Sequence, residues 1–402
     1  MKIAFITYEY PPDTGKGGIG TYTQQIVSFL SSHHFDVHVF AGSHSRSEKI
    51  YDNGVVIHWV KCDGPDDFQN KVLPVFTAEN EMHQFNIIES AEIHANALQI
   101  KNSFPHIPLI VRLHAPNHLV ESLKKKYVSF IQKLRFFLGA LRRFKWDLGY
   151  WRKYQKENDR DYQFTLKADY ITAPSNAMKD WAVRYWNIAP HKISVIPNIF
   201  IPPAQLLNIP ILNEYHYKTV LFFGRLNVLK GLVTATKVMR KILLKYPDWK
   251  FVVVGDDGNS PKKDLSMKQW MMSELKSVNH QVLFYEGVSY DRLPNLIAQS
   301  EIVLLPSLFE SFSYTCAEAM AAGKAVFGSN SGGMSDMIEN GVSGFLVNPE
   351  DADDIYLKLK KIIEDEKLYF NLTNNARTQI IKSYSNDFFC NSIIKFYLKL
   401  KI

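Results

Sequence analysis

Residues 306–326 read PSLFESFSYTCAEAMAAGKAV, and this stretch decides the fold class. It begins at the end of one short apolar run, 302–306, and runs into another, 325–329, and we interpret both runs as strands. Between them, a short loop carrying Glu310 leads into a helix that is predicted to begin near Phe312. A strand, a helix and a second strand in this order form a βαβ unit, and nearly continuous apolar strands indicate a parallel sheet covered on both faces.

The same alternation of short apolar runs and longer helical patterns extends along the chain. The candidate strands of the first half are 2–8, 36–41, 55–60, 86–90, 109–114, 170–174 and 193–197. Those of the second half are 219–224, 250–255, 282–286, 302–306, 325–329 and 344–348. A proline-rich stretch between the two series is typical of an interdomain connection. We therefore predict two doubly wound α/β domains, residues 1–198 and 218–385, joined by a linker at 199–217, with ligands beyond the carboxyl ends of the strands in the cleft between them.

The overall composition is that of a soluble globular protein with two cores. The chain has 402 residues, of which 46% are hydrophobic and 22% charged. No apolar run reaches the roughly 18–20 residues of a membrane span, and Pro11 and Pro12 interrupt the N-terminal run, so no signal peptide is expected. The three scattered cysteines suit neither a disulfide framework nor a zinc site, which favours a cytoplasmic location.

The first candidate site lies in the stretch quoted above. A helix that starts after the loop presents free backbone N–H groups and a positive dipole end, which together attract phosphate. Glu310 and Glu318 are eight residues apart, roughly 12 Å along a helix. One carboxylate can therefore reach a sugar and the other a ribose, with a diphosphate between them. The alternative is that Glu318 is an ordinary buried helix residue and Glu310 an ordinary acid before a helix.

A second candidate site is the turn FGRLNVLKG at 223–231, which follows a predicted strand. Arg225 and Lys230 are five residues apart and can converge on a diphosphate leaving group. Arg225 suits bidentate phosphate contact, whereas Lys230 acts as a mobile point charge. A solvated Arg/Lys pair is the alternative.

A third candidate is the glycine-rich loop 15–20, GKGGIG, which contains the letters of a dinucleotide-binding motif. The motif requires its glycines directly after the strand, but six residues, 9–14, lie between strand 2–8 and this loop. Strand 36–41 also ends without the acid that a ribose requires. A nicotinamide-dependent dehydrogenase is therefore disfavoured. We interpret the loop as a place where the backbone can approach an anionic or sugar group near a helix N-terminus.

Taken together, these motifs resemble glycosyltransferase family 4, the retaining, glycogen-synthase-like branch of the GT-B architecture. The resemblance runs from PPDTGKGGIGTY through IVRLHA, KISVIPN, GRLNVLKG, VVVGDDG and YEGVSYDRLPNLIAQSEIVLLPS to the Glu-x7-Glu segment and SGGMSDMIENGVSGFLVNPED. It implies a GT-B fold whose C-terminal helix, 386–402, crosses back to the first domain.

The resemblance also implies roles for individual residues. Arg225 and Lys230 would hold the diphosphate, Glu310 and His114 would contact the transferred sugar, and Glu318 would bind the ribose hydroxyls. The remaining donor contacts would come from backbone at Gly17, Gly18, Gly287, Val288, Ser313, Tyr314 and Thr315. Ser313 stands where the family often has glycine, and Asp336 where it often has glutamate.

The expected reaction moves a hexose-type sugar from a UDP- or GDP-sugar to a hydroxyl of a glycan or lipid-linked acceptor. No motif supplies an obvious carboxylate beneath the anomeric carbon, which disfavours a covalent intermediate. We expect front-face substitution with retention, in which the departing phosphate accepts the acceptor's proton. Asp256–Asp257 and Asp66–Asp67 lack the Asp-x-Asp spacing of metal-dependent transferases, so neither a metal nor a cofactor is predicted. A non-catalytic nucleotide-sugar binding protein and a nucleotide-sugar epimerase are the alternatives.

Residues 122–156 form a basic and aromatic segment, with eleven Lys or Arg against one acid in a chain of net charge +7. Apolar residues from Leu123 to Trp151 step by three and four, which predicts a long helix. The segment is interpreted as a first-domain helix with a solvated cationic face, as a peripheral attachment to anionic lipid on the inner face of the cytoplasmic membrane, or, least favoured, as a nucleic-acid site. The candidate contacts for a membrane or acceptor are Lys124, Lys125, Lys126, Arg142, Arg143 and Trp146.

Overall fold

The computed structural model describes residues 1–15, 17–289, 291–384 and 386–400. The chain divides into two compact units, each of which has its own sheet and its own core. Unit 1 contains 1–118, 155–200 and the stretch from 386, and unit 2 contains 119–154 and the stretch from 201 to 384.

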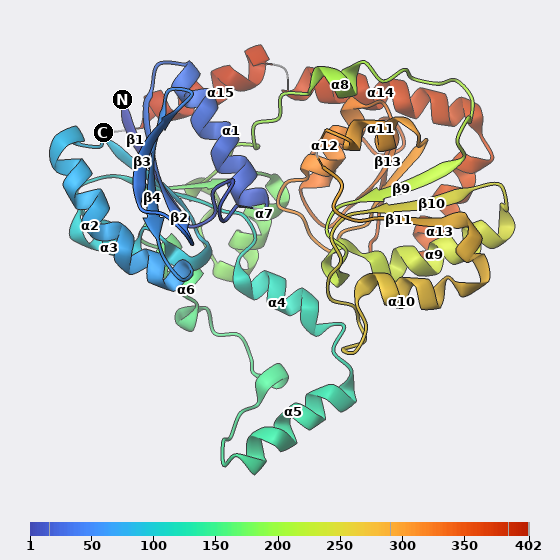
Figure 1. The fold of residues 1–402 in the computed structure, drawn as a ribbon, viewed down its shortest axis with the longest axis horizontal. Coiled ribbons are helices and arrows are strands. Elements are labelled where there is room, and N and C mark those ends of the chain that lie inside the picture. Colours follow the sequence, from blue (N-terminus) through green and yellow to red (C-terminus); the bar gives the residue numbers. More distant parts are fainter. Residues whose placement is uncertain (16, 290, 385, 401–402) are drawn as a thin grey trace. The chain divides into compact units, whose positions relative to one another are not determined.

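Unit 1 is built on an eight-stranded sheet in the order β3-β4-β2-β1-β5-β6-β7-β8. The strands are β1 (Lys2–Thr7), β2 (Asp36–Ser43), β3 (Glu48–Asp52), β4 (Val55–Lys61), β5 (Ile87–Ala91), β6 (Leu109–Arg112), β7 (Tyr170–Ala173) and β8 (Ile193–Val195). All pair in parallel except β3, which is antiparallel to β4. The main helices are α1 (Gly18–Ser32), α2 (Pro65–His83), α3 (Leu98–Ser103), α6 (Arg160–Thr165) and α7 (Asn176–Trp181) (Figure 1).

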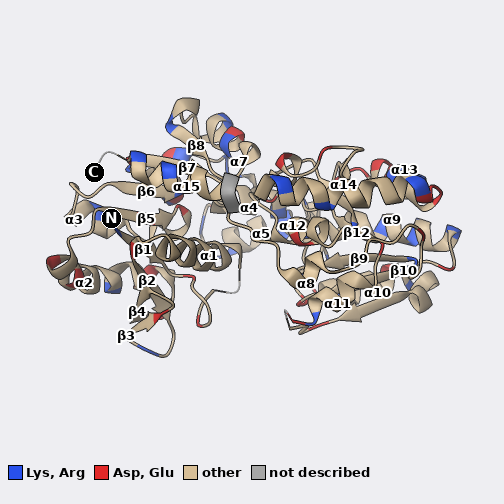
Figure 2. Cartoon of the chain, turned by 90° about the horizontal axis from the view of Figure 1, so that it is seen from above, with Lys and Arg blue, Asp and Glu red and all other residues tan. Residues whose placement is uncertain are grey.

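Unit 2 is built on a six-stranded parallel sheet in the order β11-β10-β9-β12-β13-β14. Its strands are β9 (Thr219–Phe223), β10 (Lys250–Val254), β11 (Val282–Tyr285), β12 (Ile302–Leu305), β13 (Ala325–Ser329) and β14 (Phe345–Val347). The principal helices are α9 (Leu232–Lys245), α10 (Met267–Glu274), α11 (Leu293–Ala298), α12 (Tyr314–Ala321), α13 (Ala352–Ile363) and α14 (Glu366–Tyr384). Acids in the first turn of α13 and lysines in its last turn, red and blue in Figure 2, complement the helix dipole.

Both sheets place their first strand in the interior. β1 lies between β2 and β5, and β9 lies between β10 and β12, so the strand order reverses direction beside each first strand. In doubly wound sheets, ligands bind beyond the carboxyl ends of the strands at this reversal. The loops that follow β9 and β12, and those that follow β1 and β5, are therefore the positions where the fold favours a site.

The C-terminal helix α15 (Asn386–Lys399) belongs to unit 1, as predicted. Tyr397 is buried and donates a hydrogen bond from its hydroxyl to the carboxylate of Glu89 on β5. Its ring also lies 6.2 Å from that of Phe35. The predicted fold class, with two doubly wound α/β domains and a returning C-terminal helix, is confirmed.

Two segments differ from the sequence-based prediction. The predicted linker 199–217 contains a short helix, α8 (Ala204–Leu207). Residues 119–154 group with unit 2 rather than with the first domain, and Lys126 pairs with Glu350 at 2.7 Å.

The single long helix predicted across 123–151 is wrong. The structure has α4 (Asn117–Lys125) and α5 (Phe130–Arg142) instead. Ser129 starts α5 with a capping box, in which its hydroxyl accepts from the Gln132 backbone N–H. Phe144, with φ of +54°, follows the end of α5. Among the described residues, no helix is both long and apolar enough to cross a membrane.

Candidate sugar-nucleotide site

The turn after β9 is shaped by a cap and by a glycine. The Asn227 side chain accepts a hydrogen bond from the Lys230 backbone N–H at 3.2 Å. Gly231 has φ of +70°, and a Cβ on it would lie 1.7 Å from the Pro306 carbonyl oxygen. Only glycine therefore allows this turn to lie against the loop that follows β12. The side chain of Arg225 projects from the same turn and is exposed.

This close approach brings together two motifs that are about eighty residues apart in the sequence. The Lys230 ammonium donates a hydrogen bond to the Glu310 carboxylate, and the Leu308 N–H donates to the Leu229 carbonyl at 2.8 Å. Both charged side chains keep some contact with solvent, with 28% of Lys230 and 20% of Glu310 exposed. The structure thus places an ammonium and a carboxylate side by side at the carboxyl edge of β9 and β12.

Helix α12 begins beside this pair, two residues later than predicted. Ser313 is the N-cap, with φ of −135°, and its hydroxyl accepts from the Cys316 N–H at 3.3 Å. Because φ is negative, the serine found where the family often has glycine causes no backbone strain. Tyr314 and Thr315 form the first turn and are partly exposed. The positive end of the α12 dipole therefore lies next to Glu310 and Lys230.

Glu318, on the same helix, lines a pocket with mostly apolar walls. The other lining residues come from α8 and α11 and from the residues before them: Pro203, Gln205, Leu206, Leu293, Pro294 and Ile297. Glu318 is 8% exposed, and its carboxylate is the one charged group among these lining residues. Gly287 and Val288 follow β11 and are not among the lining residues, and Gly287 has φ of +60° with open space where a Cβ would be.

Two further glycines, Gly332 and Gly333, support the Glu310 loop. A Cβ on Gly332 would lie 2.3 Å from the Glu310 carbonyl oxygen, and the Gly333 N–H donates to that oxygen at 2.7 Å. A Cβ on Gly333 would lie 2.4 Å from the Ser311 carbonyl. The motif SGGMSD was visible in the sequence, but its packing partner was not.

In unit 1, the glycine-rich loop leads into α1. Gly17 is the N-cap of this helix, and a Cβ on Gly18 would meet nothing within 4 Å. A Cβ on Gly20 would instead lie 2.9 Å from Gly15 Cα. Gly18 is therefore open to a ligand, whereas Gly15 and Gly20 are required for packing within the loop; Lys16 lies outside the described residues.

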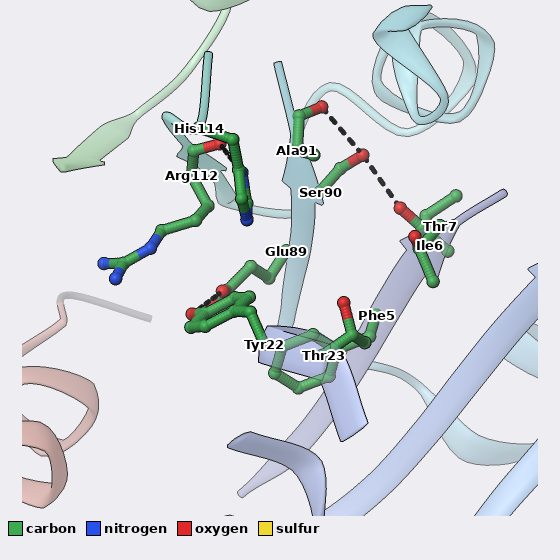
Figure 3. Close-up of a pocket in the computed structure, with 10 residues that line it drawn as sticks. All are labelled: Phe5, Ile6, Thr7, Tyr22, Thr23, Glu89, Ser90, Ala91, Arg112 and His114. Carbon is green, nitrogen blue, oxygen red and sulfur yellow. Dashed lines mark hydrogen bonds between the residues drawn. The ribbon is translucent and has the colours of Figure 1, made fainter. Parts of the chain in front are cut away.

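His114 follows β6 and lines a pocket with Tyr22, Glu89 and Arg112 (Figure 3). Its Nδ1 lies 3.1 Å from the Arg112 carbonyl oxygen, which favours the tautomer with a proton on Nδ1. Its Nε2 is buried and has no hydrogen-bond partner among the residues that the structure describes. A buried polar atom without a partner is costly, which makes Nε2 a candidate contact for a ligand hydroxyl.

The support beneath His114 was not predicted. The fully buried Glu92 accepts the His114 backbone N–H with both carboxylate oxygens, each at 2.9 Å. Asp161 is also buried, and it accepts the Asn117 N–H at 2.9 Å. Burial, with a further contribution from the negative charge of Glu92, raises the pKa of Asp161 to about 7.

The residues predicted to contact a membrane or acceptor lie on α4, on α5 and after it. Lys124 pairs with Glu121 at 2.8 Å, and Lys126 pairs with Glu350. Lys125 ends α4, Arg142 ends α5, and Arg143 follows it. Trp146 is 77% exposed. The predicted residues are therefore divided between the end of α4, where Lys124 and Lys126 form ion pairs, and an exposed group at the end of α5.

Comparison with solved structures defines the class to which this arrangement belongs. The fold matches sucrose-phosphate synthase from Thermosynechococcus elongatus with a TM-score of 0.75 and 18% identity, over 99% of this chain and 98% of that one. It matches the Anabaena protein HepE, solved in complex with UDP, with a TM-score of 0.68 and 17% identity over the whole of both chains. The fold is that of the GT-B glycosyltransferases.

Sequence comparisons identify the family. Residues 16–200 match Glycosyltransferase Family 4, and residues 209–379 match Glycosyl transferases group 1. An uncharacterized glycosyltransferase of Methanocaldococcus jannaschii is 24% identical over 99% of this chain and 98% of its own. The lipopolysaccharide 1,2-N-acetylglucosaminetransferase of Salmonella typhimurium is 28% identical over 48% of this chain and 53% of its own. The protein is a glycosyltransferase and belongs to glycosyltransferase family 4, as its motifs predicted.

Proposed function

We propose that the protein transfers a hexose-type sugar from a UDP- or GDP-sugar to a hydroxyl of a glycan or lipid-linked acceptor, with retention and without a metal at the diphosphate. The observation that carries the proposal is the contact between Lys230 and Glu310 beside the start of α12. A carboxylate can bind hydroxyls, and an ammonium and a helix N-terminus can bind phosphate. All three lie at the same sheet edge, which suits a ligand with hydroxyls next to a diphosphate.

We assign the leaving diphosphate to Arg225, Lys230 and the backbone amides of Ser313, Tyr314 and Thr315. Lys230 lies against the β12 loop, and Arg225 projects from the same turn. Two cations and a helix dipole stabilise the negative charge that develops on the phosphate as it departs. Stabilisation of this kind supports a reaction without a metal ion.

We assign the transferred sugar to Glu310 and His114, and the nucleoside to the pocket of Glu318. Nε2 of His114 is available as a hydrogen-bond acceptor. The pocket of Glu318 combines apolar walls with one carboxylate, which suits a base and a ribose diol. Gly17 and Gly18 would approach the phosphate, and Gly287 and Val288 would approach the base.

In the proposed reaction, the bond from the anomeric carbon to the phosphate oxygen breaks first, which leaves an oxocarbenium-like sugar paired with the diphosphate. The acceptor oxygen then bonds to the anomeric carbon from the face that the phosphate leaves. The acceptor's proton passes to the departing phosphate oxygen. The enzyme mainly positions the reactants and stabilises charge.

The transfer reaction can be tested with a panel of UDP- and GDP-sugars and a glycan or lipid-linked acceptor. The proposal expects nucleoside diphosphate release that depends on the acceptor, a product with the donor's anomeric configuration by NMR, and no increase in rate with added Mg²⁺ or Mn²⁺. An inverted product would contradict retention. Formation of an epimeric donor would favour an epimerase, and binding without turnover across the panel would favour a non-catalytic binding protein.

We further propose that the segment 130–151 attaches the enzyme to an anionic membrane surface, at the inner face of the cytoplasmic membrane. Ten exposed large hydrophobic side chains lie in this segment, including Phe144 at 99% and Trp146 at 77%. Arg142 and Arg143 are exposed beside them. Aromatic rings next to basic groups suit the interface of an anionic bilayer. A lipid-linked acceptor also agrees with the name of a Campylobacter jejuni relative, N,N'-diacetylbacillosaminyl-diphospho-undecaprenol alpha-1,3-N-acetylgalactosaminyltransferase. That relative is 26% identical over 54% of this chain and 56% of its own.

Membrane attachment can be tested by co-sedimentation with anionic and neutral liposomes at low and high salt. The proposal expects binding to anionic liposomes that salt weakens and that Phe144→Ser with Trp146→Ser largely removes. Leu357→Ser, an exposed change on α13, serves as the control. Equal sedimentation of the double variant and the wild type would exclude the segment as the attachment site.

A further inference from the structure

A cluster of metal-ligating side chains lies in unit 1, away from the carboxyl edge of its sheet. Asp36 and His38 come from the first half of β2, and His58 comes from the middle of β4. Glu79 and His83 lie in the last turns of α2. Their position towards the amino end of β2 separates them from the loops where sugar nucleotide is expected.

The donor atoms are close together. His38 Nδ1 lies 3.0 Å from His58 Nε2, and His58 Nδ1 lies 3.7 Å from a Glu79 oxygen. The other Glu79 oxygen lies 3.4 Å from His83 Nε2. One donor atom from each of His38, His58 and Glu79 can be chosen so that all lie within 4.8 Å of one another. Ligand atoms about 2.0–2.1 Å from a tetrahedral zinc ion lie roughly 3.3 Å apart. The contacts of His58 with His38 and with Glu79 use opposite nitrogens of its ring, so side chains of this cluster must rotate before one ion can reach all three ligands.

His38 and His58 have the buried surroundings of a metal ligand rather than those of a surface histidine. His38 is 1% exposed and His58 is 2% exposed. The ring of Phe40 stacks on His58 at 4.4 Å, and Phe85 lies edge-on to His38 at 5.0 Å. Packing therefore fixes both rings in place, as a structural metal site requires of its ligands.

We propose that His38, His58 and Glu79 bind a divalent transition metal of the Zn²⁺ class. His83, which lies near Asp36 and His38 and also faces Glu79, would move in as the fourth ligand. Three imidazoles and one carboxylate form a donor set that zinc accepts. The site is structural: it would tie α2 to β2 and β4, and it takes no part in sugar transfer. This metal site is therefore separate from the proposed diphosphate site, where the reaction needs no metal.

The ammonium of Lys49, on β3, would compete with a metal ion for the Glu79 carboxylate. Its ammonium lies 2.8 Å from the Glu79 oxygen that also faces His83. A bound cation would have to displace this ammonium, because two positive charges cannot share one carboxylate oxygen without repulsion. The wild-type affinity should therefore be limited by Lys49, and removal of its charge should strengthen binding.

The test uses the untagged full chain, stripped with chelator and titrated with Zn²⁺ by calorimetry and by thermal unfolding. The proposal expects one saturable site and a melting temperature that rises with Zn²⁺, since the metal binds the folded state. Glu79→Gln and His83→Gln should each weaken binding about tenfold or more. Lys49→Gln should strengthen it. His191→Gln, an exposed histidine outside the cluster, should bind like the wild type.

Both substituted ligands lie at or near the surface, so folding of the variants can be checked by their melting temperatures in chelator. The absence of a saturable site would overturn the proposal. So would wild-type affinity in both Glu79→Gln and His83→Gln, or equal affinity in Lys49→Gln. Loss of binding in His191→Gln would show that Zn²⁺ binds elsewhere, and would overturn it as well.

Discussion

At the scale of single residues, the buried Asp161 is expected to make the stability of the protein depend on pH. Burial raises the pKa of Asp161 to about 7, whereas an unfolded aspartate titrates near 3.9. The folded protein therefore holds a proton that the unfolded chain has lost between about pH 4 and 7. Stability linked to this group is complete below pH 4 and is lost as the pH rises through 7.

We predict that Asp161→Asn flattens this part of the pH dependence. The variant keeps an oxygen for the Asn117 N–H but carries no charge at any pH. Between pH 5 and 8, the free energy of unfolding of the wild type should fall by about 1–3 kcal/mol more than that of the variant. Urea unfolding across this range measures the difference. Parallel pH profiles for the two proteins would mean that Asp161 is ionised throughout.

At this scale the candidate motifs could be read from the sequence, but the residues that support them in the structure could not. Arg225, Lys230, Glu310 and Glu318 stand in short local patterns, which a sequence displays directly. Glu92 supports His114 across 22 residues, and Gly332 contacts Glu310 only through tertiary packing. The sequence around Glu92, or around Gly332 and Gly333, does not indicate which distant residue each of them contacts.

At the scale of elements, the contact between Gly332 and the Glu310 loop leads to a second prediction. Gly332→Ala would place a Cβ 2.3 Å from the Glu310 carbonyl oxygen, which is backbone and cannot rotate away. The loop must shift, so we expect a loss of about 1–3 kcal/mol in stability and a fall in transfer rate of about tenfold or more.

Gly139→Ala is the matched control, because a Cβ there meets nothing within 4 Å and alanine favours helix. Transfer assays and thermal unfolding on both variants give the comparison. If Gly332→Ala retained the wild-type transfer rate, the Glu310 loop would not need this support.

Strands were easier to predict than the basic segment. Each predicted strand has a counterpart, since buried parallel strands are almost wholly apolar. β3, which reads EKIYD, was missed because it is short, polar and antiparallel at the sheet edge. The helix across 123–151 was mispredicted because apolar spacing continues through Ser129, whereas the capping box that starts a new helix depends on only two side chains.

At the scale of the whole molecule, the C-terminal helix is held to unit 1 by a buried polar contact. Tyr397 and Tyr22 both donate hydrogen bonds to the carboxylate of Glu89. Burial raises the pKa of Glu89, because apolar surroundings disfavour the charged carboxylate. The hydrogen bonds from the two tyrosines act in the opposite direction and stabilise the charged form. The return of the last helix was implied by family resemblance, but the tyrosine that anchors it could not be singled out, since its partner is 308 residues away.

We predict that Tyr397→Phe lowers the free energy of unfolding by about 1–3 kcal/mol, because one donor to a buried carboxylate is lost. Urea unfolding at pH 7 measures the change. Tyr51→Phe, at a tyrosine that is 76% exposed, should leave stability within about 0.5 kcal/mol of the wild type. Equal stability of the Tyr397→Phe variant and the wild type would show that the hydroxyl does not hold α15 in place.

The central claim is that one pyrophosphate is bound by the guanidinium of Arg225, the ammonium of Lys230 and the start of α12. Calorimetric titration with UDP, GDP and their parent nucleosides tests it most directly. The wild type should prefer one nucleoside diphosphate over its nucleoside, and Lys230→Ala and Arg225→Ala should each weaken diphosphate binding about tenfold or more and leave nucleoside binding unchanged. Lys237→Ala, an exposed lysine on α9, should behave like the wild type. Unchanged diphosphate affinity in both Lys230→Ala and Arg225→Ala would contradict the account.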